Sequence, residues 1–286
     1  MVKKYGDLYL QARRALLPSE GENASMAARE LLAMASEKSV ASVLADSGLY
    51  ASEPIEEKLN GYVARMLAHE PLPYILGQWD FYGLSLEVTP DVLIPRDDTM
   101  AVTELAIETL RTRPQPQRVL DLCCGSGCIG LAIAHQLPSA RVTLADISRP
   151  ALAVAKRNIK RLKLMNRVTA IGLDARKRAP SFVGTLDTLV CNPPYVTSAE
   201  MAQLEPSVRL YEPSLALDGG SDGLAFYRAV CENYTHLIAE GGYLCFEFGL
   251  GQHVAVSMLL QEYGYTDITL RKDLRGVVRA VRGRKK

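Results

Sequence analysis

The chain has 286 residues, of which 33 are lysine or arginine and 32 are aspartate or glutamate, so its formal net charge is +1. This balance does not indicate a protein that binds nucleic acid through a generally basic surface. No apolar run reaches the ~18 residues of a membrane span, and the amino-terminal residues lack the apolar stretch of a secretory signal. We therefore expect a cytoplasmic protein with no membrane partner.

The first 76 residues predict a small helical domain. Apolar residues between positions 55 and 67 recur with the spacing of one helix face, and Ser52 is a candidate N-cap for that helix. Two more helices are expected at residues 8–17 and 24–35. Because no strand pattern appears in this part of the chain, we expect residues 1–76 to form an N-terminal helical domain.

Residues 77–98 predict a β-hairpin linker. Two short apolar runs, at residues 81–88 and 92–94, flank the turn-forming residues 89–91. Such a hairpin would join the helical domain to a second domain.

Residues 99–286 predict an α/β domain, because strand patterns alternate with helical patterns from Arg118 onward. This alternation is typical of βαβ units in a parallel sheet covered on both faces. The seven strand candidates resemble the sheet of a Rossmann-like (class I) methyltransferase. They lie at residues 119–123, 142–147, 168–173, 188–191, 243–248, 267–270 and 278–281.

A glycine-rich turn follows the first of these strands. Gly125-Ser126-Gly127-Cys128-Ile129-Gly130 matches the G-x-G-x-x-G pattern, and Asp146 ends the next strand. Glycines let the backbone approach a ligand, and the acid can accept hydrogen bonds from a ribose diol. The pattern alone does not separate a nicotinamide dinucleotide from S-adenosylmethionine, and a tight turn without any ligand is the alternative interpretation.

Two further acids favour S-adenosylmethionine. Asp121 precedes the glycines, where it would repel a pyrophosphate but suit a cationic methionyl group. Asp174 ends the third strand and is placed to accept a hydrogen bond from the adenine amino group, although it could instead cap a helix.

Asn192-Pro193-Pro194-Tyr195 ends the fourth strand. Two prolines remove two backbone donors and fix two φ angles, so the tetrad predicts a rigid loop that presents the Asn192 side-chain oxygen and the Pro193 carbonyl. Two nearby acceptors suit a planar NH2 group, either of an amide or of an amino-substituted base, on which Tyr195 could pack. Holding that nitrogen toward a methyl donor would be catalysis by positioning and electrostatics. A plain proline-rich turn is the alternative.

The six cysteines do not indicate a metal site. Cys123, Cys124 and Cys128 cluster, but no pair has the spacing of a zinc site and the four histidines are distant in sequence. We expect these cysteines to act as small packing residues.

Taken together, these segments make the chain similar to the HemK-type peptide chain release factor N(5)-glutamine methyltransferases over almost its whole length. The resemblance implies that the chain transfers a methyl group from S-adenosylmethionine, leaving S-adenosylhomocysteine, to the glutamine side-chain nitrogen of the release factor Gly-Gly-Gln motif. It also implies a helical domain for substrate recognition, release factors as partners, no direct nucleic-acid substrate and a monomer. The segments that carry it are residues 73–77, 81–84, 92–96, 121–130, 192–195, 211–213 and 216–224 and the ending at Arg284.

The resemblance also implies roles for particular residues. Asn192, Pro193, Pro194 and Tyr195 would hold and orient the glutamine amide. The cofactor would be bound by Asp121, Cys123, Gly125, Ser126, Gly127, Asp146, Ile147, Asp174, Ala175 and Asn192.

Three positions depart from the family pattern. Cys123 stands where the first glycine of the turn is usual, and Met100 stands where a glutamate is usual. Ala175 stands where an aromatic residue often follows the acid, so we expect adenine packing from elsewhere, with Ile147 as a candidate.

Other functions remain open at this point. The cysteine-rich glycine turn also resembles the sister enzymes that methylate a glutamine of a ribosomal protein. A nucleic-acid amino methyltransferase would use the same acceptor pair, but it usually carries a basic or target-recognition module. A non-catalytic binding module would require Asn192 or the glycine turn to be broken, and neither is.

Overall fold

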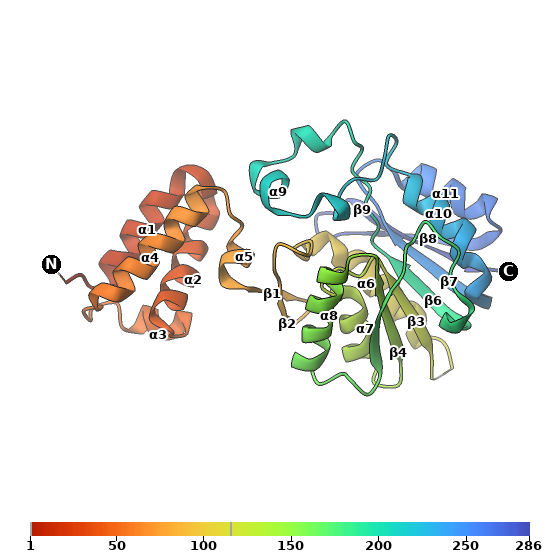
Figure 1. The fold of residues 1–286 in the computed structure, drawn as a ribbon, viewed down its shortest axis with the longest axis horizontal. Helices are drawn as coiled ribbons and strands as arrows, with labels where there is room; N and C mark the ends of the chain where they lie inside the picture. Colours follow the sequence, from red (N-terminus) through yellow and green to blue (C-terminus); the bar gives the residue numbers. More distant parts are fainter. Residues whose placement is uncertain (1, 115) are drawn as a thin grey trace. The chain divides into compact units, whose positions relative to one another are not determined.

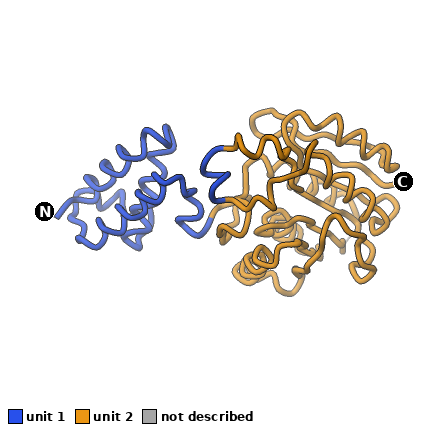
Figure 2. Tube along the Cα trace, turned by 45° about the horizontal axis from the view of Figure 1, so that its top comes forward, with its two compact units in different colours: residues 1–78, 205–211 blue, residues 79–204, 212–286 orange. Residues whose placement is uncertain are grey.

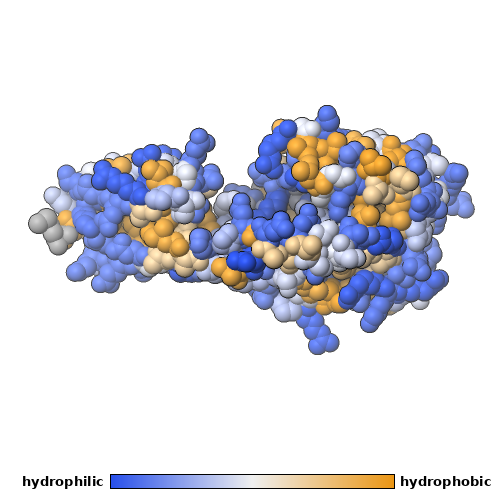
Figure 3. Space-filling model, turned by 90° about the horizontal axis from the view of Figure 1, so that it is seen from above, coloured by the Kyte–Doolittle hydropathy of each residue, from blue (hydrophilic) through white to orange (hydrophobic). Residues whose placement is uncertain are grey.

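The computed structural model describes residues 2–114 and 116–286, which divide into two compact units (Figure 2). The first unit runs to Gln78 and also includes Glu205–Tyr211, and the second contains Trp79–Leu204 and Glu212–Lys286. On the face shown in Figure 3, hydrophilic side chains are interspersed with apolar patches. Within the described residues, no helix is long and apolar enough to cross a membrane.

The first unit is helical. Much of its core is formed by α2, whose Ala27, Ala28 and Leu31 are fully buried. The small side chains of the two alanines let the neighbouring helices pack closely. The Tyr211 hydroxyl donates to the Ala68 carbonyl at 2.8 Å, which ties the distant segment α9 to the end of α4. Its helices are α1 (Tyr5–Glu20), the 3-10 helix η1 (Gly21–Asn23), α2 (Ala24–Ser36), α3 (Val40–Ala45), α4 (Glu53–Leu67), α5 (Leu72–Leu76) and α9 (Pro206–Tyr211).

The hairpin uses a different turn from the predicted one. Strands β1 (Gln78–Phe81) and β2 (Leu84–Glu87) are joined by Tyr82 and Gly83, whose φ angles are 51° and 76°. Positive φ at both central residues is the geometry of a tight two-residue hairpin, and a tyrosine at the first position hides the usual sequence signal. The predicted strand at residues 92–94 is wrong, because this segment bonds to the side chain of Glu212 instead of to another strand.

The second unit contains the seven-stranded sheet, which confirms the predicted fold class. The strand order is β5-β4-β3-β6-β7-β9-β8, with β9 antiparallel to both its neighbours and the other pairs parallel. The strands are β3 (Arg118–Leu122), β4 (Arg141–Asp146), β5 (Val168–Gly172), β6 (Leu186–Cys191), β7 (Ile238–Glu247), β8 (Tyr265–Lys272) and β9 (Val278–Lys285).

Helices cover both faces of this sheet (Figure 1). Side chains alternate along each strand, so Val119 packs under the first group of helices and Leu120 under the second. The hairpin residues Phe81 and Leu86 join the first core. The first group comprises α6 (Met100–Arg111), α7 (Cys128–Gln136) and α8 (Arg149–Arg161), and the second comprises α10 (Ala225–Tyr234) and α11 (His253–Glu262). The remaining elements are short 3-10 helices: η2 (Asp97–Thr99), η3 (Ser181–Val183), η4 (Met201–Gln203), η5 (Ser214–Ala216) and η6 (Thr235–Leu237).

The strand order places a reversal between β3 and β6. The chain first moves outward from β3 to β4 and β5, and then returns to the other side of β3 with β6 and β7. Connections that leave neighbouring parallel strands in opposite directions open a crevice at the carboxyl ends of those strands, where ligands bind in open α/β sheets.

Candidate functional site

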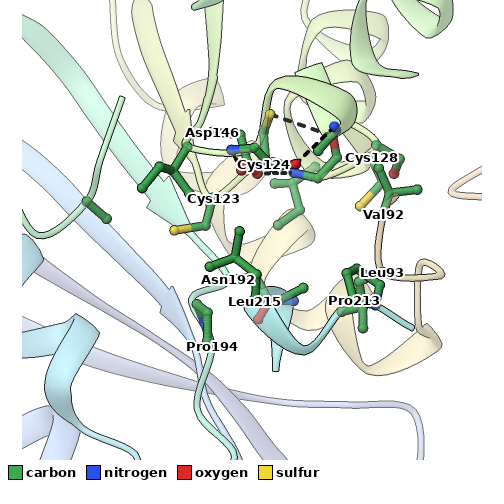
Figure 4. A pocket seen from close by; sticks show the side chains of 18 of the residues that line it. Val92, Leu93, Cys123, Cys124, Cys128, Asp146, Asn192, Pro194, Pro213 and Leu215 are labelled. Carbon is green, nitrogen blue, oxygen red and sulfur yellow. Dashed lines mark hydrogen bonds between the residues drawn. The ribbon is translucent and has the colours of Figure 1, made fainter. Parts of the chain in front are cut away.

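A pocket lies at the carboxyl ends of β3, β4, β5 and β6, and Figure 4 shows labelled side chains that line it. Of the predicted site residues, nine line this pocket: Cys123, Gly125, Ser126, Asp146, Ile147, Asp174, Ala175, Asn192 and Pro194. Four others, Asp121, Gly127, Pro193 and Tyr195, do not line it. The remaining lining residues include Val92, Arg96, Thr99, Cys124, Cys128, Leu173, Pro213, Leu215 and Phe226.

The glycines of the turn have different tasks. Gly125 and Gly127 have φ angles of 53° and 85°, which side chains rarely adopt. A Cβ at Gly127 would lie 2.7 Å from Leu144 Cδ1, and one at Gly130 would clash with Leu144 Cδ2. A Cβ at Gly125 would meet nothing within 4 Å. Gly127 and Gly130 therefore allow close packing of α7 on the sheet, and Gly125 keeps the backbone open beside the pocket.

Asp146 is held by the backbone at the end of β4. Its Oδ2 accepts a hydrogen bond from the Gly125 N–H at 2.9 Å, and its Oδ1 accepts one from the Ser148 N–H at 2.9 Å. Burial raises the pKa of Asp146, and these backbone hydrogen bonds oppose that rise. Each carboxylate oxygen has a further lone pair, so Asp146 can also accept hydrogen bonds from two ligand hydroxyls.

Asp121 has a structural position that differs from the expected one. It is fully buried, and its Oδ2 accepts a hydrogen bond from the Gly130 N–H at 2.8 Å in the first turn of α7. Burial raises its pKa to about 7. An acid already occupies this end of the helix, so the helix terminus is a poor site for a pyrophosphate. Asp121 thus disfavours a dinucleotide without reaching the pocket itself.

The pocket also has an aromatic lining residue that no sequence pattern predicted. Phe226, in α10, lines the pocket, and the Arg176 guanidinium carbon lies 5.8 Å from the centre of its ring. Asp174 Oδ1 accepts hydrogen bonds from the backbone and side chain of Arg176. Burial raises the pKa of Asp174, but the contacts with Arg176 outweigh it and the net pKa is lowered. Phe226 can supply the planar surface that Ala175 lacks, and no local pattern connects the two positions.

The cysteines of the turn line the pocket as thiols. Cys124 is buried, and burial is the main cause that raises the pKa of both Cys124 and Cys128 above the ordinary thiol range. In the part of the chain that the structure describes, no group of three or more His, Cys, Asp or Glu side chains is arranged to hold a metal ion.

The loop after β6 is braced from behind by two glycines. A Cβ at Gly219 would lie 2.7 Å from Tyr195 Cα and 2.8 Å from the Pro194 carbonyl oxygen. A Cβ at Gly223 would lie 2.5 Å from the Tyr195 carbonyl oxygen, to which Gln252 Nε2 also donates at 3.2 Å. These close backbone contacts explain why the loop needs glycine at two positions far along the chain.

An ion pair between the buried Glu212 and the partly exposed Arg96 fixes another wall, and no sequence pattern predicted a role for it. Glu212 is only 6% exposed, accepts a hydrogen bond from the Ile94 N–H at 3.1 Å and pairs with the Arg96 guanidinium. Arg96 and Pro213 both line the pocket. The pair therefore joins two distant segments of the second unit beside the loop of Asn192.

These residues fit S-adenosylmethionine. Asp146 offers acceptors for a ribose diol, Leu173 and Phe226 offer apolar surface for adenine, and Gly125 leaves room for the ligand beside the backbone. The Asp146 carboxylate also places negative charge in the pocket, which suits a cationic ligand, whereas Asp174 is paired with Arg176.

The strand order, the glycine turn and the acids at the strand ends define a class I methyltransferase. Residues 96–206 match the family described as methyltransferase small domain, and residues 7–77 match the one described as PrmC N-terminal domain. The catalytic domain of hMettl16, solved in complex with MAT2A 3'UTR hairpin 6, shares the fold with a TM-score of 0.55 at 16% identity, over 71% of this chain and 76% of that chain.

Curated relatives define the family more closely. The release factor glutamine methyltransferase of Geobacter sulfurreducens is 43% identical over 78% of this chain and 76% of its own length. The protein of the same name from Bradyrhizobium diazoefficiens is 36% identical over 92% of this chain and 89% of its own length. The chain belongs to the release factor glutamine methyltransferase family, which uses S-adenosylmethionine.

Replacing Gly219 by alanine should damage the loop of Asn192. The added methyl group would press on the backbone of Pro194 and Tyr195, and such overpacking typically costs about 1–3 kcal/mol of stability. Denaturant unfolding and methyl-transfer assays should both show the loss. Gly61→Ala is the matched control: a Cβ there meets nothing within 4 Å, and it should stabilise α4 by about 0.5–1 kcal/mol. Equal behaviour of the two variants would contradict the bracing role.

Replacing Asp146 by alanine should weaken the binding of S-adenosylmethionine by about 1.5–3 kcal/mol, since a charged acceptor of hydroxyl donors is lost. Calorimetric titration measures this affinity, and circular dichroism checks that the variant is folded. A folded variant with unchanged affinity would exclude Asp146 from the ribose site.

Proposed function

We propose that the chain methylates the side-chain amide nitrogen of the glutamine in the Gly-Gly-Gln motif of peptide chain release factors. The observation that carries the proposal is the position of Asn192, which extends from the end of β6 into the pocket that fits S-adenosylmethionine. Relatives at 35–43% identity that carry the name release factor glutamine methyltransferase support the choice of acceptor. Translation termination takes place in the cytoplasm, which is therefore the proposed location.

The loop residues would hold the acceptor amide. Asn192 Oδ1 and the Pro193 carbonyl can each accept one hydrogen bond from the two N–H groups of a glutamine side chain. The lone pair of an amide nitrogen is delocalised, so the free amide is a weak nucleophile. Two acceptors on its N–H groups increase the electron density on nitrogen and fix its direction. When bound, S-adenosylmethionine supplies an electrophilic methyl group on a sulfonium.

Positive charge develops on the nitrogen as the new bond forms. The same acceptors stabilise that charge, because the N–H groups become more acidic as the reaction proceeds. The proton is lost to solvent water after the methyl group has been transferred, so the step requires no strong base before attack. Tyr195 packs against the core behind the loop, where burial raises the pKa of its hydroxyl, so it stays neutral and acts as a support.

Selectivity for a release factor requires a wider surface than the loop, since the two acceptors fit any primary amide. In this proposal residues 1–76 form the substrate-recognition domain, residues 77–98 the hairpin linker and residues 99–286 the methyltransferase domain. Contacts remote from the reacting nitrogen can contribute binding energy that aligns it. One copy of the chain carries every proposed site residue, and a monomer is the proposed active form.

The acceptor can be identified directly. The full-length protein should methylate a folded release factor at its Gly-Gly-Gln glutamine, and should modify a short peptide with the same motif much more slowly. Mass spectrometry of the products, with ribosomal protein and nucleic acid as competing acceptors, measures this preference. Label only on a ribosomal protein would favour the sister enzymes, and label on DNA or RNA would rule out the glutamine assignment.

Replacing Asn192 by alanine should reduce kcat by about 10²–10³, the usual loss when one positioned polar group that stabilises developing charge is removed. Affinity for S-adenosylmethionine should stay within a few-fold, because Asn192 acts mainly on the acceptor. Single-turnover kinetics and calorimetry separate the two effects. Turnover equal to that of the unmodified protein would refute the role of Asn192 as an acceptor clamp.

A further inference from the structure

Glu247 is a buried carboxyl group on the strand next to Asn192, and the proposed mechanism does not use it. It is the last residue of β7 and is 1% exposed. Its Oε2 has no hydrogen-bond partner within the described residues. Burying a carboxyl group with an unpaired oxygen lowers the stability of the folded protein, so its presence here needs a physical explanation.

The sheet register places Glu247 beside Asn192. Strands β6 and β7 are parallel, and Cys191 pairs with Phe246. The next residues are Asn192, which follows the end of β6, and Glu247, which ends β7, so we expect their backbones to lie about one strand spacing apart, roughly 5 Å. The same two residues come from segments that are separated by more than 50 positions in the sequence.

Side-chain contacts connect the two residues. Asn192 Nδ2 donates a hydrogen bond to Thr99 Oγ1 at 3.4 Å. The side chains of Thr99 and Asn192 are also close enough to the Glu247 carboxyl group to lower its pKa. The Asn192 NH2 group thus has Thr99 as an acceptor, and the Glu247 carboxyl group is a neighbour that can accept from its second N–H.

We propose that Glu247 is a positioning residue, which holds the NH2 group of Asn192 toward the protein and so directs Asn192 Oδ1 toward the acceptor amide. This inference rests on the proposed function. An asparagine side chain can turn by 180° and exchange its oxygen for its NH2 group. In the turned orientation Asn192 would present its own N–H donors to the glutamine amide of the substrate, which also has N–H groups. A carboxylate accepts hydrogen bonds and cannot donate them. Glu247 therefore favours the orientation in which the Asn192 NH2 group faces the protein and Asn192 Oδ1 faces the glutamine amide.

The protonation state of Glu247 decides whether this selection operates. Burial raises the pKa of Glu247 to about 7, while hydrogen bonds from Thr99 and Asn192 oppose the rise. The protonated acid has an O–H donor, which can bond to Asn192 Oδ1 in the turned orientation. Turnover should therefore be low below the pKa of Glu247 and rise as pH increases through it.

Other ionisable groups face Glu247, and none is expected to produce the same pH dependence. Asp98 raises its pKa, and Arg279 lowers it. These two form an ion pair with each other at 2.9 Å. Burial raises the pKa of Tyr195, Tyr227 and Cys128 well above neutrality, so these three groups stay protonated in the relevant range.

The central test is Glu247→Gln in the full-length protein. Glutamine has the same shape but carries an NH2 donor, so it mimics the protonated acid. We expect kcat for a release factor to fall roughly 10- to 100-fold, less than for Asn192→Ala. The rise of kcat with pH should disappear, whereas affinity for S-adenosylmethionine and the melting temperature should be maintained. The second variant, Thr99→Val, removes the hydroxyl that accepts a hydrogen bond from the Asn192 NH2 group and should also lower kcat.

A double-mutant cycle separates positioning from a general effect on the pocket. If Glu247 acts through Asn192, then Glu247→Gln should cause no further loss in the Asn192→Ala background. Asp187→Asn is the matched control, because this acid lies at the opposite end of β6, where it accepts a hydrogen bond from the Arg118 N–H. That variant should keep the pH profile of the unmodified protein.

A spectroscopic measurement gives a readout that is independent of turnover. The side-chain NH2 resonances of Asn192 should shift with pH near neutrality in the unmodified protein and in Asp187→Asn, but not in Glu247→Gln. Additive losses in the cycle, or an unchanged pH profile in Glu247→Gln, would overturn the positioning role. If the unmodified protein does not methylate a release factor at all, the proposed function fails instead, and the resonance experiment still tests the contact between Glu247 and Asn192.

Discussion

The site depends on the parallel pairing of β3, β4, β6 and β7. Because parallel strands bring their carboxyl ends to one edge of the sheet, each strand needs to supply only the residue at its end. Asp146 ends β4, Asn192 follows β6 and Glu247 ends β7. A slip of one residue in any pairing would turn these side chains to the other face of the sheet. The buried apolar cores on both faces make such a slip costly, so the packing of the core also sets the geometry of the site.

Two buried carboxyl groups stand behind the pocket, and they are stabilised in different ways. Asp121 accepts a hydrogen bond from the Gly130 N–H in the first turn of α7, where the helix dipole also favours negative charge. The negative charge of Glu247 is favoured by the side chains of Thr99 and Asn192 and by the charge of Arg279, whereas Asp98 opposes it. Burial raises the pKa of both acids to about 7. Asp121 shapes the turn that faces the cofactor, whereas Glu247 faces the residue that would hold the acceptor.

Much of the fold and part of the site could be predicted from the sequence, because both depend on local patterns. The strand candidates, the glycine turn and the Asn192 loop each carry a signal within about ten residues. The hairpin turn was misplaced because Tyr82 adopts a positive φ without the usual asparagine or glycine. Phe226, Glu212 and Glu247 were missed because their roles come from tertiary contacts, and a single phenylalanine or glutamate has no pattern that indicates such contacts. All four residues of the loop from Asn192 to Tyr195 were predicted as site residues, and of these the structure places Asn192 and Pro194 in the lining of the pocket.

Cys123 shows how a departure from the family pattern can be accommodated. Its φ is 61°, a conformation that glycine adopts without strain and that costs other residues of order 1 kcal/mol. Its side chain packs against the second apolar core. That burial offsets part of the backbone strain, which a solvent-exposed side chain could not do. The turn therefore keeps its shape without the first glycine, because the backbone conformation is fixed by Gly125, Gly127 and the hydrogen bond from the Cys124 N–H to the Ala145 carbonyl.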